Sequence, residues 1–419
     1  MTKDTGTVCQ QAVILVGGRG SRLGDLTDNC PKPLMLISEN VTFLDLLIDE
    51  VLRQGFKDIL LLAGYLADQM IERYSEHREK DCIRVIVEKK PMGTGGALAN
   101  CLPFLEEQFL LLNGDTWFDF NWRALEKELH QNHDAQAVIA LLPDQKESRY
   151  GNVLIKNNCI LSFAEKEETQ LTGIGDEYER AINGGAYYCR RSMLDEVDDT
   201  AFSLEEVLLP KLAQTGQLLG IIGTGYFIDI GLPETLEYCR SHYPDFLKRP
   251  ALFLDRDGTL NHDAGYTHKR EDCQLIKGAA ELVRHYCDRG WHVFVVTNQA
   301  GIGKGLYDES AMIAFHAELN HNLIFHGGGI VHDFNYCPYT GDANNEIYKI
   351  ENHPDRKPNP GMILSLSKQW PINMESSLLI GDREKDVEAA RRANIEGFLF
   401  TGDDLWEFAC KVGLIKGDR

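Results

Sequence analysis

The chain alternates short apolar runs with amphipathic segments of helical spacing, and it does so in two successive series. In the first series, apolar runs bounded by turn residues predict strands at residues 12–16, 58–63, 83–87, 109–112 and 137–142. Helix-type spacing lies between them, at residues 43–54, 67–75 and 122–131. Strands alternating with helices favour a mainly parallel sheet, so this pattern predicts an α/β fold.

The first series then loosens and a second one begins. Shorter strands are predicted near residues 152–155, 160–165 and 186–189, followed by helices near 204–214 and 233–240. Helix signals stop at residues 241–246, which places a domain boundary near 243–249. The second series predicts strands at 251–254, 292–296, 331–336 and 377–380, and helices at 279–288, 309–323, 361–367 and 385–392. We therefore expect two α/β domains, residues 1–245 and 246–419.

Composition and charge restrict the classes of partner. The 419 residues carry a formal net charge of -21, which repels nucleic acids and anionic membranes at long range and favours small phosphorylated ligands held in local positive pockets. The first residues lack the apolar core of a signal peptide and no apolar run is long enough to span a membrane. Eleven cysteines without a C-x-x-C pair favour reduced thiols. These features predict a cytoplasmic protein; they are compatible with a homo-oligomer but do not indicate one.

A glycine-rich turn follows the first predicted strand. Gly17, Gly18 and Gly20 leave backbone N–H groups open to an anion, because no Cβ obstructs its approach. The turn is neither a Walker A loop nor a dinucleotide fingerprint, since no Gly-Lys-Ser/Thr follows and Leu23 stands where the third glycine would be. Arg22 and Lys32 add two cations, which suit a triphosphate.

This stretch resembles the G-G-x-G-x-R-L…P-K-P-L pattern of the sugar-1-phosphate nucleotidyltransferases, and the resemblance extends through about 240 residues. It implies a Rossmann-like, GT-A-like mixed sheet, and catalytic roles for Arg22 and Lys32. The implied nucleotide-binding residues are Gly17, Gly18, Gly20, Arg22, Lys32, Glu88, Gly93, Thr94 and Gly95. Asp115 and Asp229 match its metal carboxylates and would hold Mg²⁺. The implied sugar-phosphate residues are Tyr150, Gly151, Glu165, Lys166, Asn183 and Gly184.

A second signature, Asp255-Arg256-Asp257-Gly258-Thr259, follows the apolar strand at residues 251–254. Two carboxylates at this spacing let one attack phosphorus while the other gives a proton to the leaving oxygen. The string resembles the haloacid dehalogenase (HAD) superfamily of phosphohydrolases, which implies a Rossmann-like parallel sheet. It also implies Asp255 as nucleophile and Asp257 as general acid and base. Thr297 would supply a hydroxyl for the phosphoryl oxygens, and Lys357 would stabilise the charged nucleophile and the phosphate. Mg²⁺ would be bound by Asp255, the Asp257 carbonyl and Asp382, whereas Asp386 is expected to support Asp382 or cap the next helix.

Four strings, residues 255–261, 265–266, 296–305 and 356–362, resemble the D-glycero-D-manno-heptose 1,7-bisphosphate phosphatases, which are close to histidinol phosphatases. The resemblance places Asn298, Lys304 and Arg356 against the sugar phosphate. Relatives of this kind commonly carry a zinc loop, but here only Cys337 stands at its start and His353 precedes Arg356, so four ligands cannot be assembled. We expect no structural zinc, with Cys337 and His353 as packing and surface residues.

The two halves together indicate consecutive steps on one sugar phosphate. The second half would remove the 7-phosphate, and the first half, which resembles heptose 1-phosphate guanylyltransferases, would join heptose 1-phosphate to a nucleotide with release of pyrophosphate. Hydrogen-bond logic on residues 88–97 leaves the base open, so GTP follows from the resemblance alone. The alternative is a hexose or N-acetylmuramate 1-phosphate nucleotidyltransferase using UTP or another NTP, fused to a phosphatase of different sugar-phosphate or histidinol-phosphate specificity. A non-catalytic scaffold is disfavoured because the carboxylates that both reactions require are all present. They are Asp115, Asp229, Asp255, Asp257 and Asp382.

Overall fold

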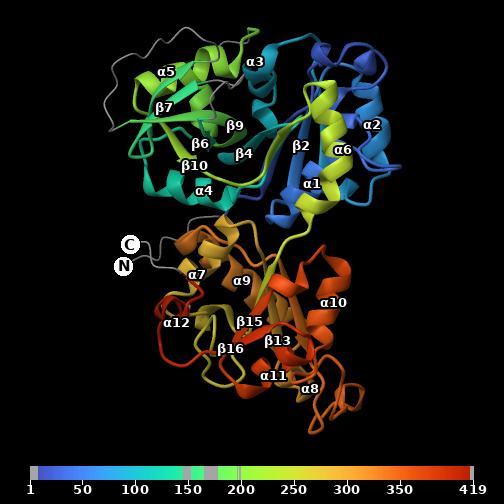
Figure 1. Ribbon diagram of the computed structural model, residues 1–419, viewed down its shortest axis with the longest axis vertical. Helices are drawn as coiled ribbons and strands as arrows, with labels where there is room; N and C mark the ends of the chain where they lie inside the picture. Colours follow the sequence, from blue (N-terminus) through green and yellow to red (C-terminus); the bar gives the residue numbers. More distant parts are fainter. Residues whose placement is uncertain (1–7, 145–151, 165–177, 196, 198–199, 416–419) are drawn as a thin grey trace. The chain divides into compact units, whose positions relative to one another are not determined.

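The computed structural model describes residues 8–144, 152–164, 178–195, 197 and 200–415. The chain divides into two compact units. The N-terminal unit is Cys9–Pro244, and the C-terminal unit is formed from Asp245 onward together with Val8, which packs in its core. Each unit is built on its own sheet (Figure 1).

The described strands of the main sheet of the N-terminal unit follow the order β3-β2-β1-β4-β9-β6-β10-β8-β7. Their bounds are β1 Gln11–Leu15, β2 Asp58–Ala63, β3 Ile83–Val87, β4 Gln108–Asn113, β6 Ala137–Pro143, β7 Asn152–Lys156, β8 Cys159–Ala164, β9 Glu179–Arg190 and β10 Leu218–Ile222. Strands β3, β2, β1 and β4 are parallel, but β9 runs antiparallel to both of its neighbours β4 and β6. The sheet is therefore mixed, as the family resemblance implies.

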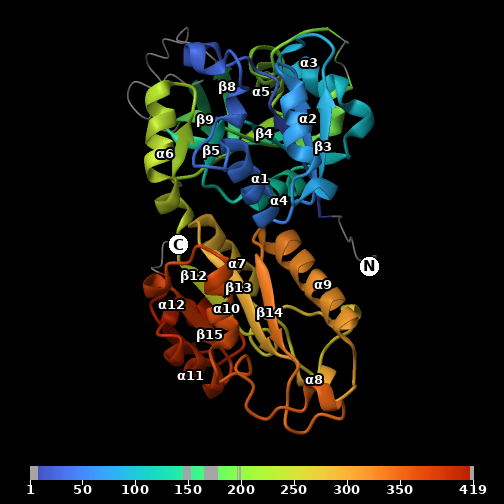
Figure 2. The same cartoon turned by 90° about the vertical axis from the view of Figure 1, so that its right-hand side faces the viewer.

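Helices cover both faces of this sheet (Figure 2). One face packs against α1 Phe43–Arg53, α2 Ala67–Ser75 and α4 Trp122–Gln131, and the other against α3 Gly93–Asn100 and α5 Leu209–Gln214. A separate two-stranded ribbon pairs β5 Thr116–Phe118 with β11 Phe227–Asp229. The alternating apolar residues of β1 explain the two cores, because Ala12 and Ile14 face the first layer of helices and Val13 faces the second.

Helix α6, Pro233–Leu247, corrects one sequence prediction. It continues past Arg240, where the helix was expected to end, and includes Pro244. The polar residues at the expected end support the helix instead: Ser241 Oγ donates to the Glu237 carbonyl at 3.0 Å, and the His242 ring stacks on Tyr238 one turn earlier. Pro244 falls in the last turn and has no N–H to donate to the carbonyl of Arg240, so the helix continues there without that hydrogen bond.

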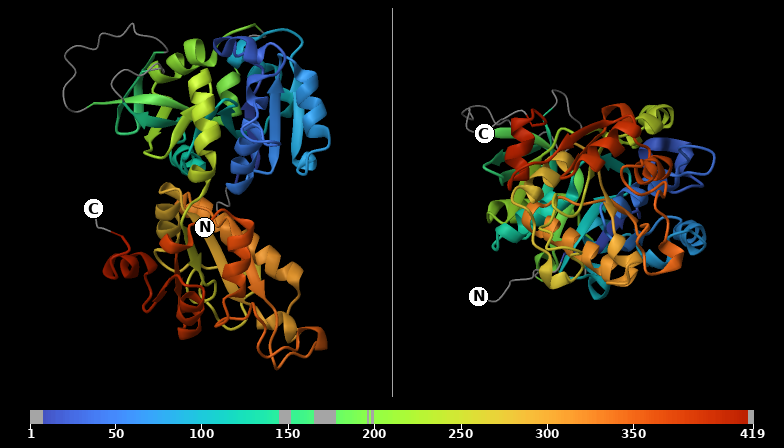
Figure 3. Two further views of the ribbon diagram at one scale, coloured as in Figure 1. Left: turned by 45° about the vertical axis from the view of Figure 1, so that its right-hand side comes forward. Right: turned by 90° about the horizontal axis from the view of Figure 1, so that it is seen from below.

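The C-terminal unit has a parallel sheet of order β14-β13-β12-β15-β16 (Figure 3). Its strands are β12 Ala251–Leu254, β13 His292–Asn298, β14 Asp333–Cys337, β15 Leu378–Gly381 and β16 Glu396–Leu399. Its helices are α7 Ala279–Asp288, α8 Ala300–Gly303, α9 Glu309–Gly327, α10 Gly361–Gln369, α11 Glu384–Arg392 and α12 Leu405–Lys411. Residues of α7, α9 and α12 pack on one face of the sheet, and residues of α10 and α11 on the other.

Parallel pairing brings the sequence motifs together at one edge of each sheet. In the N-terminal unit, the segments that follow β1, β2, β3 and β4 leave the sheet at the same edge. In the C-terminal unit, Asp255 follows β12, Thr297 lies near the end of β13 and Asp382 follows β15. Open α/β sheets bind ligands at such carboxyl ends.

Candidate active sites

The loop after β1 is shaped by its glycines. Gly20 has a φ of 67°, and a Cβ built there would stand 3.0 Å from the Cβ of Lys32. The space around the Cβ position of Gly18 is open, so a ligand can approach the backbone closely. Arg22 is exposed at the start of the 3-10 helix Ser21–Thr27. The loop thus offers main-chain donors beside two solvent-facing cations, Arg19 and Arg22.

The ribbon of β5 and β11 brings two carboxylates to this loop. Asp115 immediately precedes β5 and Asp229 ends β11. The buried Lys32 ammonium lies 2.6 Å from Asp115 Oδ2 and 3.7 Å from Asp229 Oδ1. Burial and the neighbouring Asp115 raise the pKa of Asp229, although Lys32 opposes the shift. Two carboxylates at one point, with incomplete charge compensation, are a donor set that fits a divalent cation.

Glu88, which follows β3, closes the other side of the loop. A Cβ on Gly64 would stand 2.2 Å from Glu88 Oε1, and one on Gly17 would stand 3.1 Å from it. The Met92 N–H donates to Glu88 Oε2 at 3.3 Å. Partial burial raises the pKa of Glu88. Gly64, and less tightly Gly17, therefore leave the space that this carboxylate occupies beside the loop.

The next predicted nucleotide-binding residues begin helix α3. Gly93 has a φ of 70°, and the Gly95 N–H donates to the Phe202 carbonyl at 3.1 Å. The Thr94 hydroxyl donates to Glu205 at 2.7 Å and accepts from the Leu204 N–H. The start of α3 is thus fastened to residues 202–205, which the sequence analysis did not connect with the site.

Only part of the predicted sugar-phosphate set can be placed. Asn183 and Gly184 lie in β9, beside the end of β4. The Asn183 amide donates to Tyr187 and its oxygen accepts from the Gly185 N–H. A Cβ on Gly184 would meet the Ala140 carbonyl at 2.7 Å. The other predicted residues, Tyr150, Gly151, Glu165 and Lys166, lie outside the described residues.

In the C-terminal unit, a buried lysine joins two carboxylates. Lys357 Nζ lies 2.7 Å from Asp255 Oδ1 and 2.7 Å from Asp386 Oδ1. Burial by itself would raise the pKa of Asp255, but Lys357 outweighs it and holds that pKa below its ordinary value. Burial alone would likewise lower the pKa of Lys357, and the two carboxylates raise it instead. Asp255 therefore remains a charged carboxylate, the form a nucleophile requires.

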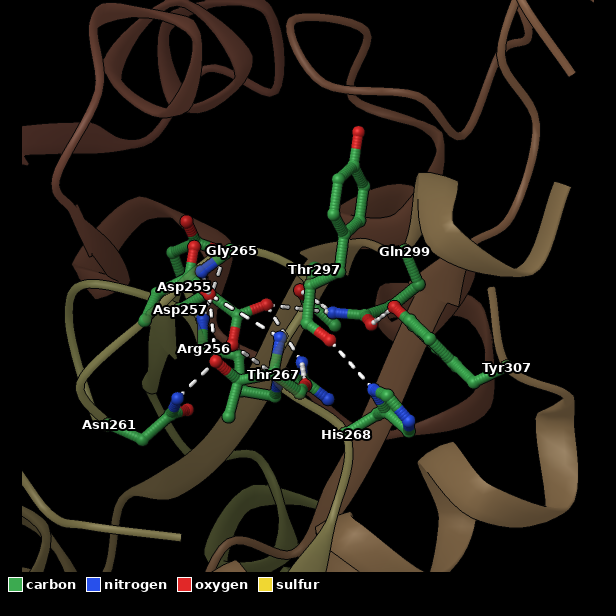
Figure 4. A network of polar contacts seen from close by, with 12 residues as sticks. Asp255, Arg256, Asp257, Asn261, Gly265, Thr267, His268, Thr297, Gln299 and Tyr307 are labelled. Atoms are coloured by element: carbon green, nitrogen blue, oxygen red, sulfur yellow. Dashed lines mark hydrogen bonds and ion pairs between the residues drawn. The ribbon is translucent and has the colours of Figure 1, made fainter. Parts of the chain in front are cut away.

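Asp257 is held by four hydrogen bonds (Figure 4). Arg256 donates to Oδ1 at 2.9 Å and to Oδ2 at 2.8 Å, as a two-pronged guanidinium contact. Asn261 also donates to Oδ1, and Gln299 donates to Oδ2. The Arg256 guanidinium is itself buried over the ring of Phe315 and bonds the Thr267 carbonyl. The second aspartate of the signature is thus fixed in direction.

Asp382 completes a group of carboxylates. Oxygen atoms of Asp255, Asp382 and Asp386 lie within 4.8 Å of one another, the one such group of three or more potential ligands found among the described residues. Burial and Asp255 raise the pKa of Asp382 to about 6, and its buried Oδ1 has no hydrogen-bond partner within the described parts of the chain. An orphaned carboxylate oxygen beside other carboxylates fits a hard divalent cation. Asp386 also caps α11 by accepting from the Arg383 N–H.

A pocket of about 430 Å³ opens beside Asp255 and Asp257. Its lining includes the predicted residues Asp255, Asp257, Thr297, Asn298, Lys304 and Arg356. The Asn298 side chain pairs with the N–H and carbonyl of Lys357, so it positions that lysine as well as facing the pocket. Lys304 contacts Asp342 at 2.6 Å and the Tyr266 hydroxyl at 3.0 Å. The cations Lys304 and Arg356 thus line the same pocket as the carboxylates Asp255 and Asp257.

The segment before Lys357 is held by aromatic contacts. His353 stacks on Tyr339 at 3.8 Å between ring centroids, Tyr348 packs edge-on against Tyr339, and Arg356 donates to the Tyr339 carbonyl. Cys337 is fully buried at the end of β14. No group of three potential ligands that includes Cys337 or His353 occurs in the described ranges.

Several residues of the site were not predicted from the sequence. Gln299 belongs to a string noted for its resemblance, but its contact with Asp257 depends on the fold, and Tyr307 gave no signal at all. Arg256 could have been suspected, because a charged residue between two aspartates on a buried strand end needs a partner. Arg383 and Lys385 line the pocket as further cations.

Two protein families match this chain, one in each compact unit. The Nucleotidyl transferase family matches residues 11–244, and the HAD-hydrolase-like family matches residues 355–404. No helix within the described residues has the length and apolar character to span a membrane.

Three relatives cover the two halves. The chain is 40% identical over 172 residues to a D-glycero-beta-D-manno-heptose-1,7-bisphosphate 7-phosphatase of Rhodopseudomonas palustris, covering 41% of this chain and 94% of that protein. It is 34% identical over 227 residues to a D-glycero-alpha-D-manno-heptose 1-phosphate guanylyltransferase of Aneurinibacillus thermoaerophilus, covering 54% and 94%. A Drosophila melanogaster mannose-1-phosphate guanylyltransferase catalytic subunit beta is 32% identical over 58% of this chain and 63% of its own length. The chain therefore belongs to the nucleotidyl transferase family in its N-terminal half and to the HAD phosphatases in its C-terminal half, and it is a bifunctional enzyme.

Proposed function

We propose that this enzyme carries out two consecutive steps of nucleotide-activated heptose synthesis. The C-terminal site removes the 7-phosphate of D-glycero-D-manno-heptose 1,7-bisphosphate, and the N-terminal site transfers GMP from GTP to the resulting heptose 1-phosphate. The observation that carries this proposal is the presence in one chain of two carboxylate sites. Their relatives are named as a phosphatase of a β-heptose 1,7-bisphosphate and a guanylyltransferase of an α-heptose 1-phosphate.

In the phosphatase, an Asp255 oxygen attacks the phosphorus and the bond to the sugar oxygen breaks. Asp257 gives its proton to that oxygen, and an aspartyl-phosphate is left on Asp255. Water then attacks the phosphorus, Asp257 takes the proton and inorganic phosphate departs. Lys357 keeps Asp255 charged, and the Thr297 hydroxyl donates to a phosphoryl oxygen. A Mg²⁺ held by Asp255 and Asp382, with the Asp257 carbonyl, would neutralise phosphate charge when bound.

In the transferase, an oxygen of heptose 1-phosphate attacks the α-phosphorus of the nucleotide and pyrophosphate departs. No protein nucleophile is required, so this site works by positioning and by charge neutralisation. The main-chain donors of the Gly17–Gly20 turn, with Arg22 and Lys32, would hold the triphosphate. Asp115 and Asp229 would hold a Mg²⁺ that offsets the phosphate charge.

The position of Glu88 favours guanine among the bases. A carboxylate can only accept hydrogen bonds, and guanine presents two adjacent donors, its ring N–H and its amino group. Uracil presents one N–H between two carbonyl oxygens, so a carboxylate would oppose at least one of them. In the structure Glu88 Oε1 lies beside Gly64 and Gly17, and Oε2 accepts from the Met92 N–H. A base that replaced these contacts would have to supply donors, as guanine does.

Separating the two activities by mutation tests this assignment. Asp255→Asn should abolish phosphate release from heptose 1,7-bisphosphate and leave pyrophosphate release from GTP plus heptose 1-phosphate at the wild-type rate. Asp115→Asn should do the reverse. If either folded variant loses both activities, the assignment of one reaction to each unit is wrong.

A further inference from the structure

Tyr307 and Gln299 extend a chain of hydrogen bonds from Asp257 and Thr297, and Tyr307 also lines the pocket (Figure 4). The Tyr307 hydroxyl donates to Gln299 Oε1 at 2.6 Å. Gln299 Nε2 in turn donates to Asp257 Oδ2 at 3.0 Å and to Thr297 Oγ1 at 2.8 Å. Gln299 is only 1% exposed, so water cannot replace these partners.

The direction of the Gln299 amide depends on Tyr307. Both amide hydrogens are used, one on Asp257 and one on Thr297, and the oxygen is left facing the phenol. While Asp257 is ionised, an amide that turned over would place its oxygen against the carboxylate, and an acceptor would face an acceptor. Tyr307 favours the observed direction because its hydroxyl needs an oxygen to donate to.

Two neighbours fix the ring of Tyr307. The ring stacks on His268 with centroids 4.4 Å apart and planes 12° apart. A Cβ on Gly301 would stand 2.2 Å from the tyrosine ring, so only glycine leaves room for it. Burial raises the pKa of Tyr307 to about 12, and the hydroxyl therefore stays protonated as a donor.

We propose that Tyr307 is a positioning residue of the phosphatase: through Gln299 it holds the carboxyl group of Asp257 in the orientation that delivers a proton to the leaving sugar oxygen. This inference rests on the proposed role of Asp257 as general acid. In that step the bond from phosphorus to the sugar oxygen breaks, the bond to Asp255 forms, and the proton passes from Asp257 to the sugar oxygen.

The demand for this proton depends on the leaving group, and this gives a selective test. A sugar alkoxide is a poor leaving group and needs protonation, whereas p-nitrophenolate departs without it. The experiment compares kcat/KM for heptose 1,7-bisphosphate and for p-nitrophenyl phosphate, since kcat/KM reports phosphoryl transfer to Asp255. Tyr307→Phe is compared with wild type in the full chain, and Tyr286→Phe, a buried tyrosine of α7 in the same unit, is the matched control.

We expect Tyr307→Phe to lower kcat/KM for the sugar phosphate about tenfold through kcat, a part of the roughly 10²–10⁴-fold that a positioned acid contributes. KM and the rate with p-nitrophenyl phosphate should change far less, and Tyr286→Phe should match wild type. Adding Tyr307→Phe to Gln299→Leu should cost nothing further, because the phenol acts through the amide. Gly301→Ala, which displaces the ring, should reproduce the selective loss.

An equal fall with both substrates, or a Tyr307→Phe variant indistinguishable from wild type, would overturn the inference. Full additivity of the two substitutions would overturn it as well. These failures differ from failure of the proposed function, in which wild type itself would not hydrolyse heptose 1,7-bisphosphate while still hydrolysing p-nitrophenyl phosphate.

Discussion

Replacing Lys357 by methionine should destabilise the C-terminal unit strongly, beyond its effect on catalysis. The lysine side chain is 2% exposed and compensates Asp255 and Asp386, whose side chains are 7% and 0% exposed. Methionine keeps most of the volume but leaves two carboxylates buried without a cation. Removing one partner of a buried ion pair costs about 3–5 kcal/mol.

This cost can be expressed as a shift in unfolding temperature. For a unit of this size, each kcal/mol lowers the midpoint by roughly 2–4 °C, so Lys357→Met should unfold about 6–20 °C below wild type. Calorimetry of the full chain should be done in EDTA, because a divalent cation bound by the freed carboxylates would restore part of the loss. Lys277→Met, which removes an 80% exposed lysine from its ion pair with Asp404, is the matched control and should unfold with wild type.

A second substitution tests the cause. Asp386→Asn in the Lys357→Met background removes one of the uncompensated charges, and the double variant should be more stable than the sum of the two single losses. The reasoning is refuted if Lys357→Met unfolds within about 1 °C of wild type in EDTA, a shift well under that of 1 kcal/mol for a unit of this size. In that case Lys357 would not be the buried counter-ion of Asp255 and Asp386.

Two further predictions concern the transferase. Glu88→Gln should lower kcat/KM for GTP about 10-fold or more, the discrimination of roughly 1–3 kcal/mol that a good two-point base contact gives. It should also narrow the preference for GTP over UTP, measured as the ratio of kcat/KM for pyrophosphate release. Glu107→Gln, a substitution just before β4, is the control and should leave this ratio unchanged. An unchanged ratio in Glu88→Gln would contradict recognition of the base by Glu88. Asp229→Asn should abolish the transferase and remove the Mg²⁺-dependent rise in the unfolding temperature of the N-terminal unit, while slightly stabilising that unit in EDTA, because it relieves the repulsion from Asp115 that raises the pKa of Asp229. A Mg²⁺ response that persists would place the cation elsewhere.

The sequence predicts best the parts of the site that follow directly from strand ends. Asp255 and Asp382 follow two strands that were recognisable as apolar runs, and Thr297 lies near the end of a third. Parallel pairing then gathers the three residues. Lys357 was identified by resemblance as the cation beside the nucleophile Asp255, but its second carboxylate partner, Asp386, was not predicted. Asp386 lies at the start of helix α11, and this position suggested a helix cap. One of its oxygens does accept from the Arg383 N–H, but only the fold brings Lys357 against the other oxygen.

Contacts between distant segments explain most of what was missed. Strand β9 spans Glu179–Arg190, well beyond the predicted 186–189, because it pairs with β4, β6 and β7 and not because its own residues alternate clearly. Helix α3 begins inside a glycine-rich string of poor helix propensity and is held by the Phe202 carbonyl. Tyr307 was missed for the same reason, because its contacts with Gln299 and Gly301 form only when the chain folds.

The order of the two reactions is tested most directly by one incubation with heptose 1,7-bisphosphate, GTP and Mg²⁺, followed by mass spectrometry of the nucleotide sugars. Wild type should form GDP-heptose with inorganic phosphate and pyrophosphate in equal amounts. Asp255→Asn should form no nucleotide sugar from the bisphosphate, yet form GDP-heptose when heptose 1-phosphate is supplied. A nucleotide sugar that still carries the 7-phosphate would contradict the account, because the transferase would then act before the phosphatase.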